Sequence, residues 1–109
     1  MKSCNVAISE IAETDLREMV QYIAFERMEL FNERHLLSGI QEAILELEKI
    51  PYRYALVRDE RLASQGIRML PVDNHIVFYI VAEMNKSVTI VRILYGKREW
   101  RQLLWGCGQ

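Results

Sequence analysis

Apolar residues recur along the first half of the chain at the three- and four-residue spacing of an amphipathic helix. The first such stripe consists of Ala12, Leu16, Met19 and Ile23. Ser9 stands just before it as the expected N-cap, and acidic residues follow in the early turns, where the helix dipole favours them. The pattern predicts a helix that continues to about Glu26 or Glu29.

A second and clearer stripe consists of Leu37, Ile40, Ile44 and Leu47. Asn32 is the expected cap of this second helix. Pro51 is expected to end it, because the residue before a proline is disfavoured in the α region. Two such helices joined by a short turn form a helical hairpin, whose apolar side must cover another apolar surface.

Short apolar runs predict strands on either side of this hairpin. One brief run, Asn5–Ile8, precedes the first helix, whereas residues 52–66 are polar and expected to be irregular. The later runs predict strands at Ile67–Val72, Ile76–Val81 and Val88–Tyr95, followed by a short C-terminal helix at Glu99–Leu104. The order β-α-α-β-β-β indicates an α+β fold, with a small antiparallel sheet packed against the helical hairpin.

The last two predicted strands are apolar on both faces, so each is expected to be central in the sheet and covered on two sides. The helical hairpin can cover only one face. The second face is left for the terminal segment, for a groove or for a partner, which suggests a protein that works by binding.

The composition is that of one globular domain spanning residues 1–109, with 105–109 expected to form a flexible tail. No apolar run approaches the roughly 18 residues of a membrane span. The start of the chain has no signal-peptide pattern, so we expect a cytoplasmic protein without membrane contact. Cys4 and Cys107 are expected to be free thiols, and no clustered ligands suggest a metal or a cofactor.

The net charge of −1 hides an asymmetry between the two halves. Residues 1–50 carry five Lys and Arg against ten Asp and Glu, whereas residues 51–109 carry nine against five. The basic half can meet phosphates or an acidic partner. Alternatively, acidic helices and a basic sheet complement each other within the fold.

Several segments together resemble the RelE/ParE family of bacterial toxins. They are Ala12–Glu18 with Tyr22-Ile23, Ile67–Val72, His75–Val81 and Val91–Trp100. The resemblance extends from about residue 5 to Leu104. It implies the toxin of a type II toxin–antitoxin (plasmid stabilisation) system, neutralised by a cognate antitoxin that wraps it. An exposed apolar face of the sheet would suit an antitoxin segment that becomes ordered on binding.

The family divides between two targets: ParE-like members poison DNA gyrase, and RelE-like members cleave mRNA on the ribosome. The ribonuclease needs cations around the scissile phosphate and groups that accept and donate protons. Arg68 and Arg98 match basic positions of such enzymes, but Leu70 and Ile76 stand where further basic residues are expected, and no tyrosine follows Tyr95. The resemblance therefore favours a gyrase poison. A ribonuclease, and an inert relative that only binds antitoxin, remain open as alternatives.

The candidate target-binding residues are Arg68, Arg92, Tyr95, Lys97 and Arg98, and Arg68, Lys97 and Arg98 are the catalytic candidates if the protein is a ribonuclease. Each also has a structural explanation. Simple alternation puts Arg92 on the face of Ile90 and Leu94, where it could pair with a helix carboxylate. Tyr95 could be an aromatic that ends a core strand. The Lys97-Arg98 pair could be solvated charge.

Overall fold

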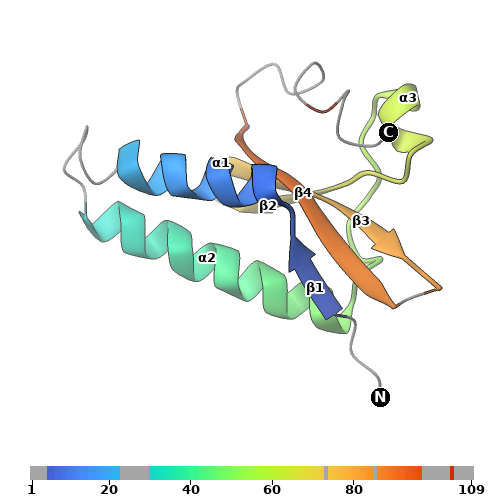
Figure 1. Ribbon diagram of the computed structural model, residues 1–109, viewed down its shortest axis with the longest axis horizontal. Helices are drawn as coiled ribbons and strands as arrows, with labels where there is room; N and C mark the ends of the chain where they lie inside the picture. The colour runs from blue at the N-terminus through green and yellow to red at the C-terminus, as the bar shows by residue number, and fades with distance from the viewer. Residues whose placement is uncertain (1–4, 23–29, 73, 85, 97–103, 105–109) are drawn as a thin grey trace.

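The computed structural model describes residues 5–22, 30–72, 74–84, 86–96 and 104, with the backbone alone for residues 30–36. Its elements are β1 (Asn5–Ile8), α1 (Glu10–Gln21), α2 (Leu30–Lys49), α3 (Glu60–Ala63), β2 (Arg68–Val72), β3 (His75–Ala82) and β4 (Ser87–Tyr95). Figure 1 shows α1 and α2 running in opposite directions, with α3 lying beyond the strands. The predicted α+β order is confirmed, with α3 as an addition.

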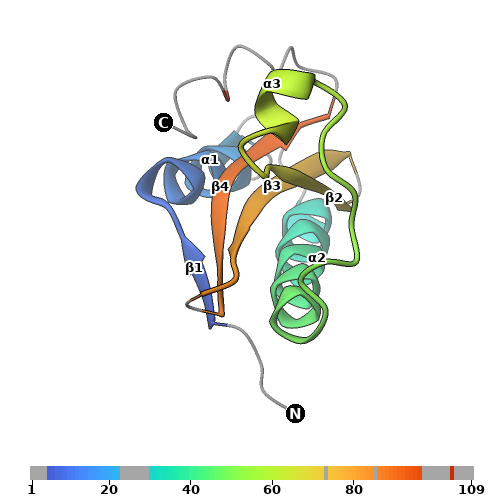
Figure 2. The ribbon, with the colours of Figure 1, turned by 90° about the vertical axis from the view of Figure 1, so that its right-hand side faces the viewer.

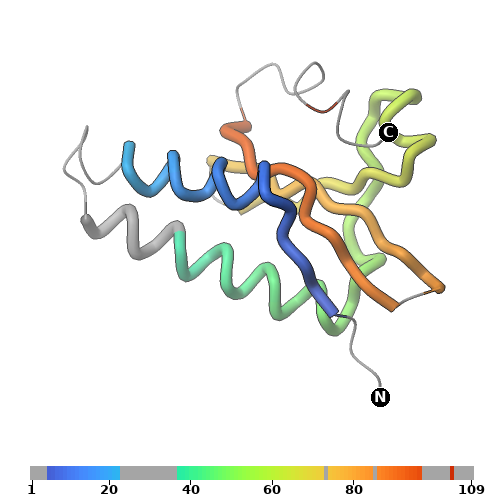
Figure 3. Tube along the Cα trace, in the orientation of Figure 1, coloured from blue at the N-terminus to red at the C-terminus, as the bar shows by residue number. Residues whose placement is uncertain are grey.

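The four strands form one sheet in the order β1-β4-β3-β2. β3 and β4 are central, as their two apolar faces predicted. β2, β3 and β4 pair antiparallel, as expected, but β1 adds to β4 in parallel, with Asn5 opposite Ser87 and Ile8 opposite Ile90. Figure 2 gives a second view of this arrangement, and Figure 3 traces β1 alongside β4 although they come from opposite ends of the chain.

The first core cluster lies between the two long helices and one face of the sheet. α1 contributes Ala12 with Leu16 and Met19, α2 contributes Ile40, Ala43, Ile44 and Leu47, and the strands contribute residues such as Val77, Tyr79 and Ile90. The described residues of both predicted stripes therefore face the sheet, except Leu37, which is not part of this cluster. Ile23 and the predicted continuation of the first helix to Glu26 or Glu29 lie outside the described residues. α1 begins at its predicted cap, because the Ser9 hydroxyl accepts a hydrogen bond from the Ala12 N–H at 3.1 Å.

Two other helix-end predictions had different outcomes. α2 ends at Lys49, two residues before Pro51, as the proline predicted. The Asn32 cap is wrong, since the chain is already helical at Leu30. A polar residue inside a first turn carries the same sequence signature as a cap, which explains the error.

The second core cluster covers the opposite face of the sheet. Phe78, Val91 and Leu94 are covered there by Val57, Leu62, Ile67 and Leu104. Phe78 is fully buried and Leu94 is only 2% exposed. The described part of this face is therefore not exposed, contrary to the expectation of an open surface for a partner. Apolar residues within the polar segment 52–66 cover it, and so does Leu104 of the terminal segment, which was one of the three predicted coverings.

α3 lies within the segment that was expected to be irregular. Asp59 caps this single turn by accepting hydrogen bonds from the N–H groups of Arg61 and Leu62, and Leu62 is buried below it. Gly66 then turns the chain into β2 with a φ of +84°, which favours glycine. The predicted C-terminal helix and the tail lie outside the described residues, except for Leu104, which is helical and fully buried.

A β-bulge interrupts the pairing of β3 with β4. Phe78 faces Arg92 and Tyr79 faces Ile90, so Val91 is an extra residue on β4. Alternation is inverted beyond this point, and Ile90 and Leu94 belong to different core clusters. Arg92, opposite Phe78, therefore shares a face with Leu94, as simple alternation predicted, but not with Ile90.

Candidate functional site

The outer edge of β4 continues past the end of β1, and α1 closes it. The Ser9 N–H donates to the Ile90 carbonyl, and the Ser9 hydroxyl donates to the Val91 carbonyl, both at 3.0 Å. One turn into the helix, the Asp15 carboxylate accepts the Ile93 N–H at 3.1 Å. The Ser9 N–H and hydroxyl and the Asp15 carboxylate therefore form the hydrogen bonds to the β4 backbone that a longer β1 would have formed.

Arg92 is held by the same carboxylate. Its Nε and Nη2 atoms donate to the two oxygens of Asp15, each at 2.8 Å, in a bidentate ion pair. The side chains are only 16% and 9% exposed. The structure thus gives Arg92 the helix carboxylate that was its structural explanation. Its role as a target contact stays a prediction.

Arg68, at the start of β2, is held by a different set of groups. Its Nη1 atom donates to the Tyr54 carbonyl at 2.6 Å, and its Cζ lies 5.1 Å from the centre of the Tyr52 ring, a cation–π distance. The guanidinium therefore joins β2 to the segment that follows α2. The Tyr52 ring is 50% exposed, so this contact lies at the protein surface.

Glu46 of α2 and neighbouring tyrosines complete what we call the Arg68 cluster: Glu46, Tyr52, Arg53, Tyr54, Arg68 and Tyr79. The Glu46 Oε1 atom accepts hydrogen bonds from Arg53 Nη1 and from the Tyr54 hydroxyl, the latter at 2.7 Å. The Tyr79 hydroxyl donates to the Pro51 carbonyl at 2.9 Å from a fully buried ring. Tyr79 is also the direct cross-strand neighbour of Arg68.

The Tyr54 and Tyr79 hydroxyls of the Arg68 cluster are poor proton-transfer groups near neutral pH. The hydrogen bond to Glu46, and then burial, raise the pKa of Tyr54 above its ordinary value of 10.0. Burial raises the pKa of Tyr79, and the charge of Arg68 opposes the rise. Arginine is also protonated at all ordinary pH values. Tyr54, Tyr79 and Arg68 are therefore better suited to binding than to accepting a proton.

The remaining candidates are only partly described. Tyr95 ends β4 with 38% of its surface exposed, and its ring meets that of His75 edge-on at 5.6 Å. Lys97 and Arg98 lie outside the described residues. Among the residues that the structure places, no group of three His, Cys, Asp or Glu could hold a metal ion, and no helix is long and apolar enough to cross a membrane.

The structure does not gather the strand candidates into one site. Arg68 faces Tyr79 on the helix-covered side of the sheet, whereas Arg92 starts opposite Phe78 and turns to Asp15 at the outer edge of β4. β3 separates their strands. Sequence reasoning missed Glu46 and the tyrosines of the Arg68 cluster. The run Tyr52-Arg53-Tyr54, which alternates aromatic and basic residues just after Pro51, was the available signal.

A comparison with models of protein families shows to which family the chain belongs. The model of the ParE toxin of the type II toxin–antitoxin system parDE matches residues 6–100, which is most of the chain. The protein belongs to the RelE/ParE family of toxins. A comparison with curated protein sequences gave no significant match.

Solved structures of this toxin family share the fold. The chain superposes on the RelBE2 toxin–antitoxin complex of Mycobacterium tuberculosis with a TM-score of 0.61 and 18% identity, covering 85% of this chain and 98% of that one. For the chromosomal ParDE system of P. aeruginosa the TM-score is 0.64 at 18% identity, covering 85% and 96%. A mutant of the E. coli toxin RelE in the free state gives 0.60 at 11% identity, covering 89% and 86%. At these identities the likeness concerns the fold alone, and it includes ParE-type and RelE-type relatives.

Proposed function

We propose that this toxin of a type II toxin–antitoxin system acts by binding DNA gyrase and is neutralised by a cognate antitoxin. The observation that carries the proposal is that both arginines on the described strands already bind groups within the protein. Arg92 is committed to Asp15, and Arg68 is committed to Tyr52 and Tyr54. A ribonuclease instead needs cations grouped around a phosphate together with a proton acceptor.

The residues between these arginines support the same proposal. Leu70, two residues after Arg68, is 3% exposed in the helix-side core. Ile76 packs against the second core cluster. Both positions at which the ribonuclease relatives are expected to carry a basic residue are therefore occupied by apolar residues that pack in or against the hydrophobic core. The exposed aromatic and arginine groups of the Arg68 cluster are of the kinds that dominate binding at protein interfaces.

The test is a plasmid supercoiling assay with purified gyrase and toxin. We expect the toxin to block supercoiling, and Arg68→Met to weaken the inhibition by at least about tenfold, because losing an interface hot spot costs about 2 kcal/mol or more. Arg17→Met is the matched control, since Arg17 is an arginine on α1 with a 64% exposed side chain. Circular dichroism on each variant separates a binding defect from unfolding.

One observation favours the ribonuclease alternative: Arg68 lies at a basic position that the resemblance assigns to such enzymes. Primer extension on mRNA in a translating extract tests it directly. New cuts that need ribosomes, together with unimpaired gyrase, would show that the gyrase proposal is wrong. Intact mRNA together with inhibited supercoiling is the expected result.

A further inference from the structure

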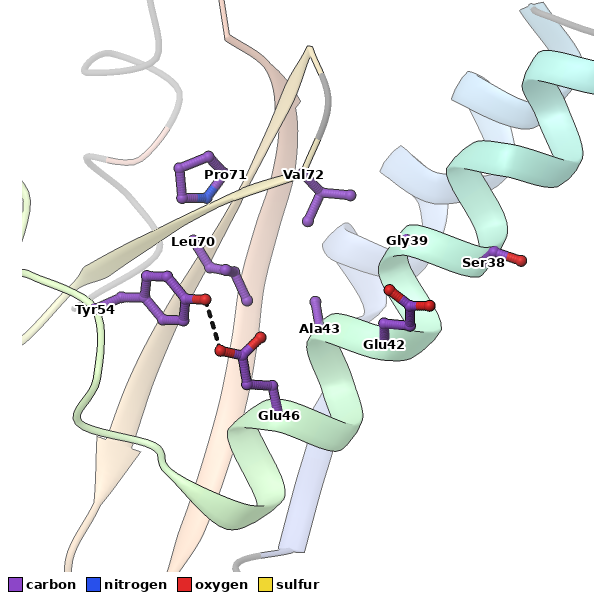
Figure 4. Close-up of a pocket in the computed structure, with 9 residues that line it drawn as sticks. All are labelled: Ser38, Gly39, Glu42, Ala43, Glu46, Tyr54, Leu70, Pro71 and Val72. Carbon is purple, nitrogen blue, oxygen red and sulfur yellow. Dashed lines mark hydrogen bonds between the residues drawn. The ribbon is translucent and has the colours of Figure 1, made fainter.

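A groove separates α2 from the edge strand β2. It has a volume of about 390 Å³ and is lined by Ser38, Gly39, Glu42, Ala43, Glu46, Tyr54, Leu70, Pro71 and Val72. Figure 4 shows Glu42 and Glu46 on the side of the helix that faces the strand, with Tyr54 reaching Glu46 from the opposite wall. The groove is separate from the Tyr52–Arg68 contact, although Glu46 and Tyr54 border both.

The lining combines an apolar floor with a negatively charged wall. Ala43, Leu70 and Val72 belong to the helix-side core and are each less than a tenth exposed. Glu42 and Glu46 are one helical turn apart, a spacing at which like charges repel. Arg53 and Tyr54 bind Glu46, whereas Glu42 is exposed and forms no ion pair or hydrogen bond within the part of the chain that the structure describes.

A long cationic side chain matches both features. The methylene stem of a lysine or arginine can lie along Leu70 and Val72 while its charged end reaches the two carboxylates. Arg53 already provides an intramolecular example, since its guanidinium binds Glu46 at the rim of the groove. A second cation between Glu42 and Glu46 would relieve their mutual repulsion. Two carboxylates without a third ligand make a poor metal site, and no metal cluster occurs among the described residues.

The edge of β2 indicates how such a partner can approach. The Met69 N–H, which points away from β3, is already bonded to the Ala55 carbonyl at 3.1 Å. Pro71, the next residue with the same orientation, has no N–H to offer. Strand addition along this edge is therefore weak, so an occupant has to insert a side chain. The carboxylates of Glu42 and Glu46 give the groove a negative charge, which attracts a basic segment.

We propose that the α2–β2 groove receives a lysine or arginine side chain of the antitoxin. The inference rests on the antitoxin partnership of the proposed function, but not on the choice between gyrase and ribosome. It also replaces the apolar sheet face as the expected contact, since residues 57–67 and Leu104 cover that face.

The first test uses a probe that requires neither antitoxin nor target. The ¹⁵N-labelled toxin is titrated by NMR with N-acetyl-arginine N-methylamide, and separately with the citrulline analogue, which has a similar shape but no charge. We expect the arginine compound alone to shift the amide signals of Gly39, Glu42 and Ala43. Glu42→Gln should weaken this response at least fivefold. Glu48→Gln, which changes a glutamate of the same helix outside the groove, should leave it intact.

Equal shifts from both compounds, or no localised shift, would overturn the cation site, whatever the gyrase assay gives. The antitoxin assignment is tested by calorimetry with the protein encoded beside the toxin gene. We expect Glu42→Arg to lower its affinity at least tenfold and Glu48→Arg to change it less than twofold. Unchanged affinity in Glu42→Arg overturns the assignment. So does sedimentation that shows a toxin dimer which Glu42→Arg dissociates, because the occupant is then a second copy.

Discussion

The two outer regions of the sheet are closed by different chemistry. Beyond β1, the edge of β4 is closed by the partly buried Ser9 hydroxyl and by the largely buried Asp15–Arg92 ion pair. The edge of β2 is closed by the segment after α2, through the Arg68 cluster at the surface. Charged contacts out of water are costly to break, whereas exposed ones contribute little. The first edge should therefore control stability, and the second is available for binding.

Asp15→Ala should have the largest effect on stability. It leaves Arg92 without its carboxylate and Ile93 without an acceptor for its N–H, and breaking a buried ion pair costs about 3 to 5 kcal/mol. Urea denaturation followed by circular dichroism measures the loss. Glu13→Ala, on the same helix but with a 61% exposed side chain, should cost less than about 0.5 kcal/mol. Equal midpoints for the two variants would contradict the proposed difference between the edges.

Ser9→Ala should come next, with a loss of about 1 to 2 kcal/mol. The change removes both the cap of α1 and the hydrogen bond to the Val91 carbonyl. Thermal denaturation provides the measurement. Ser9→Thr keeps the hydroxyl and should retain most of the stability, so a similar loss in both variants would refute the role of the hydroxyl.

On the β2 side, Tyr79→Phe should cost about 1 kcal/mol at neutral pH, because the Pro51 carbonyl loses its hydrogen-bond donor. A second effect is expected at alkaline pH. Burial raises the pKa of Tyr79 in the folded protein above 10.0, so the native state holds the proton more tightly than the unfolded chain. This contribution is complete below about pH 10, and stability falls as the pH rises from there through the folded-state pKa.

Urea titrations at several pH values above 9 would detect the alkaline effect. Tyr79→Phe should flatten the fall in unfolding free energy with pH. A wild-type slope in Tyr79→Phe would exclude this hydroxyl as its source.

Arg53→Ala should have the smallest effect, at most about 1 kcal/mol, because the ion pair with Glu46 is exposed. Salt should reduce the difference from wild type, since a pair in contact with water is screened. Denaturation at about 0.05 M and about 1 M salt measures this dependence. A loss as large as that of Asp15→Ala would remove the contrast between the two edges.

Sequence patterns predicted the parts of the fold that depend on local periodicity. The stripes of α1 and α2 and the apolar runs of β3 and β4 were sufficient, because burial imposes a repeat on each element. The parallel pairing of β1 was missed, since a four-residue run specifies neither its partner nor its direction. α3 was missed because one turn is too short to show a helical repeat. Asp59 before an acidic residue was its one local signal.

The candidate site was less predictable, because its geometry depends on contacts between distant residues. A helix carboxylate was foreseen as a partner of Arg92, but nothing local identified Asp15, 77 residues away. The bulge at Val91 places Ile90 and Arg92 on opposite faces of the sheet, and it leaves no mark in an already apolar run. Leu70 and Ile76 were recognised from the family resemblance as departures from the ribonuclease pattern, and the structure adds that both face apolar clusters.

The parallel pairing of β1 with β4 also has a consequence in time. Ser9 is separated from its acceptor at Val91 by 82 residues, so the first strand and helix are synthesised long before their partners. At typical elongation rates of about 5 to 20 residues per second, this wait lasts about 4 to 16 seconds. During that interval the edge contacts of Ser9 and Asp15 cannot form. The toxin therefore completes its sheet only after β4 has been made, and a chain truncated before β4 loses all of these contacts at once.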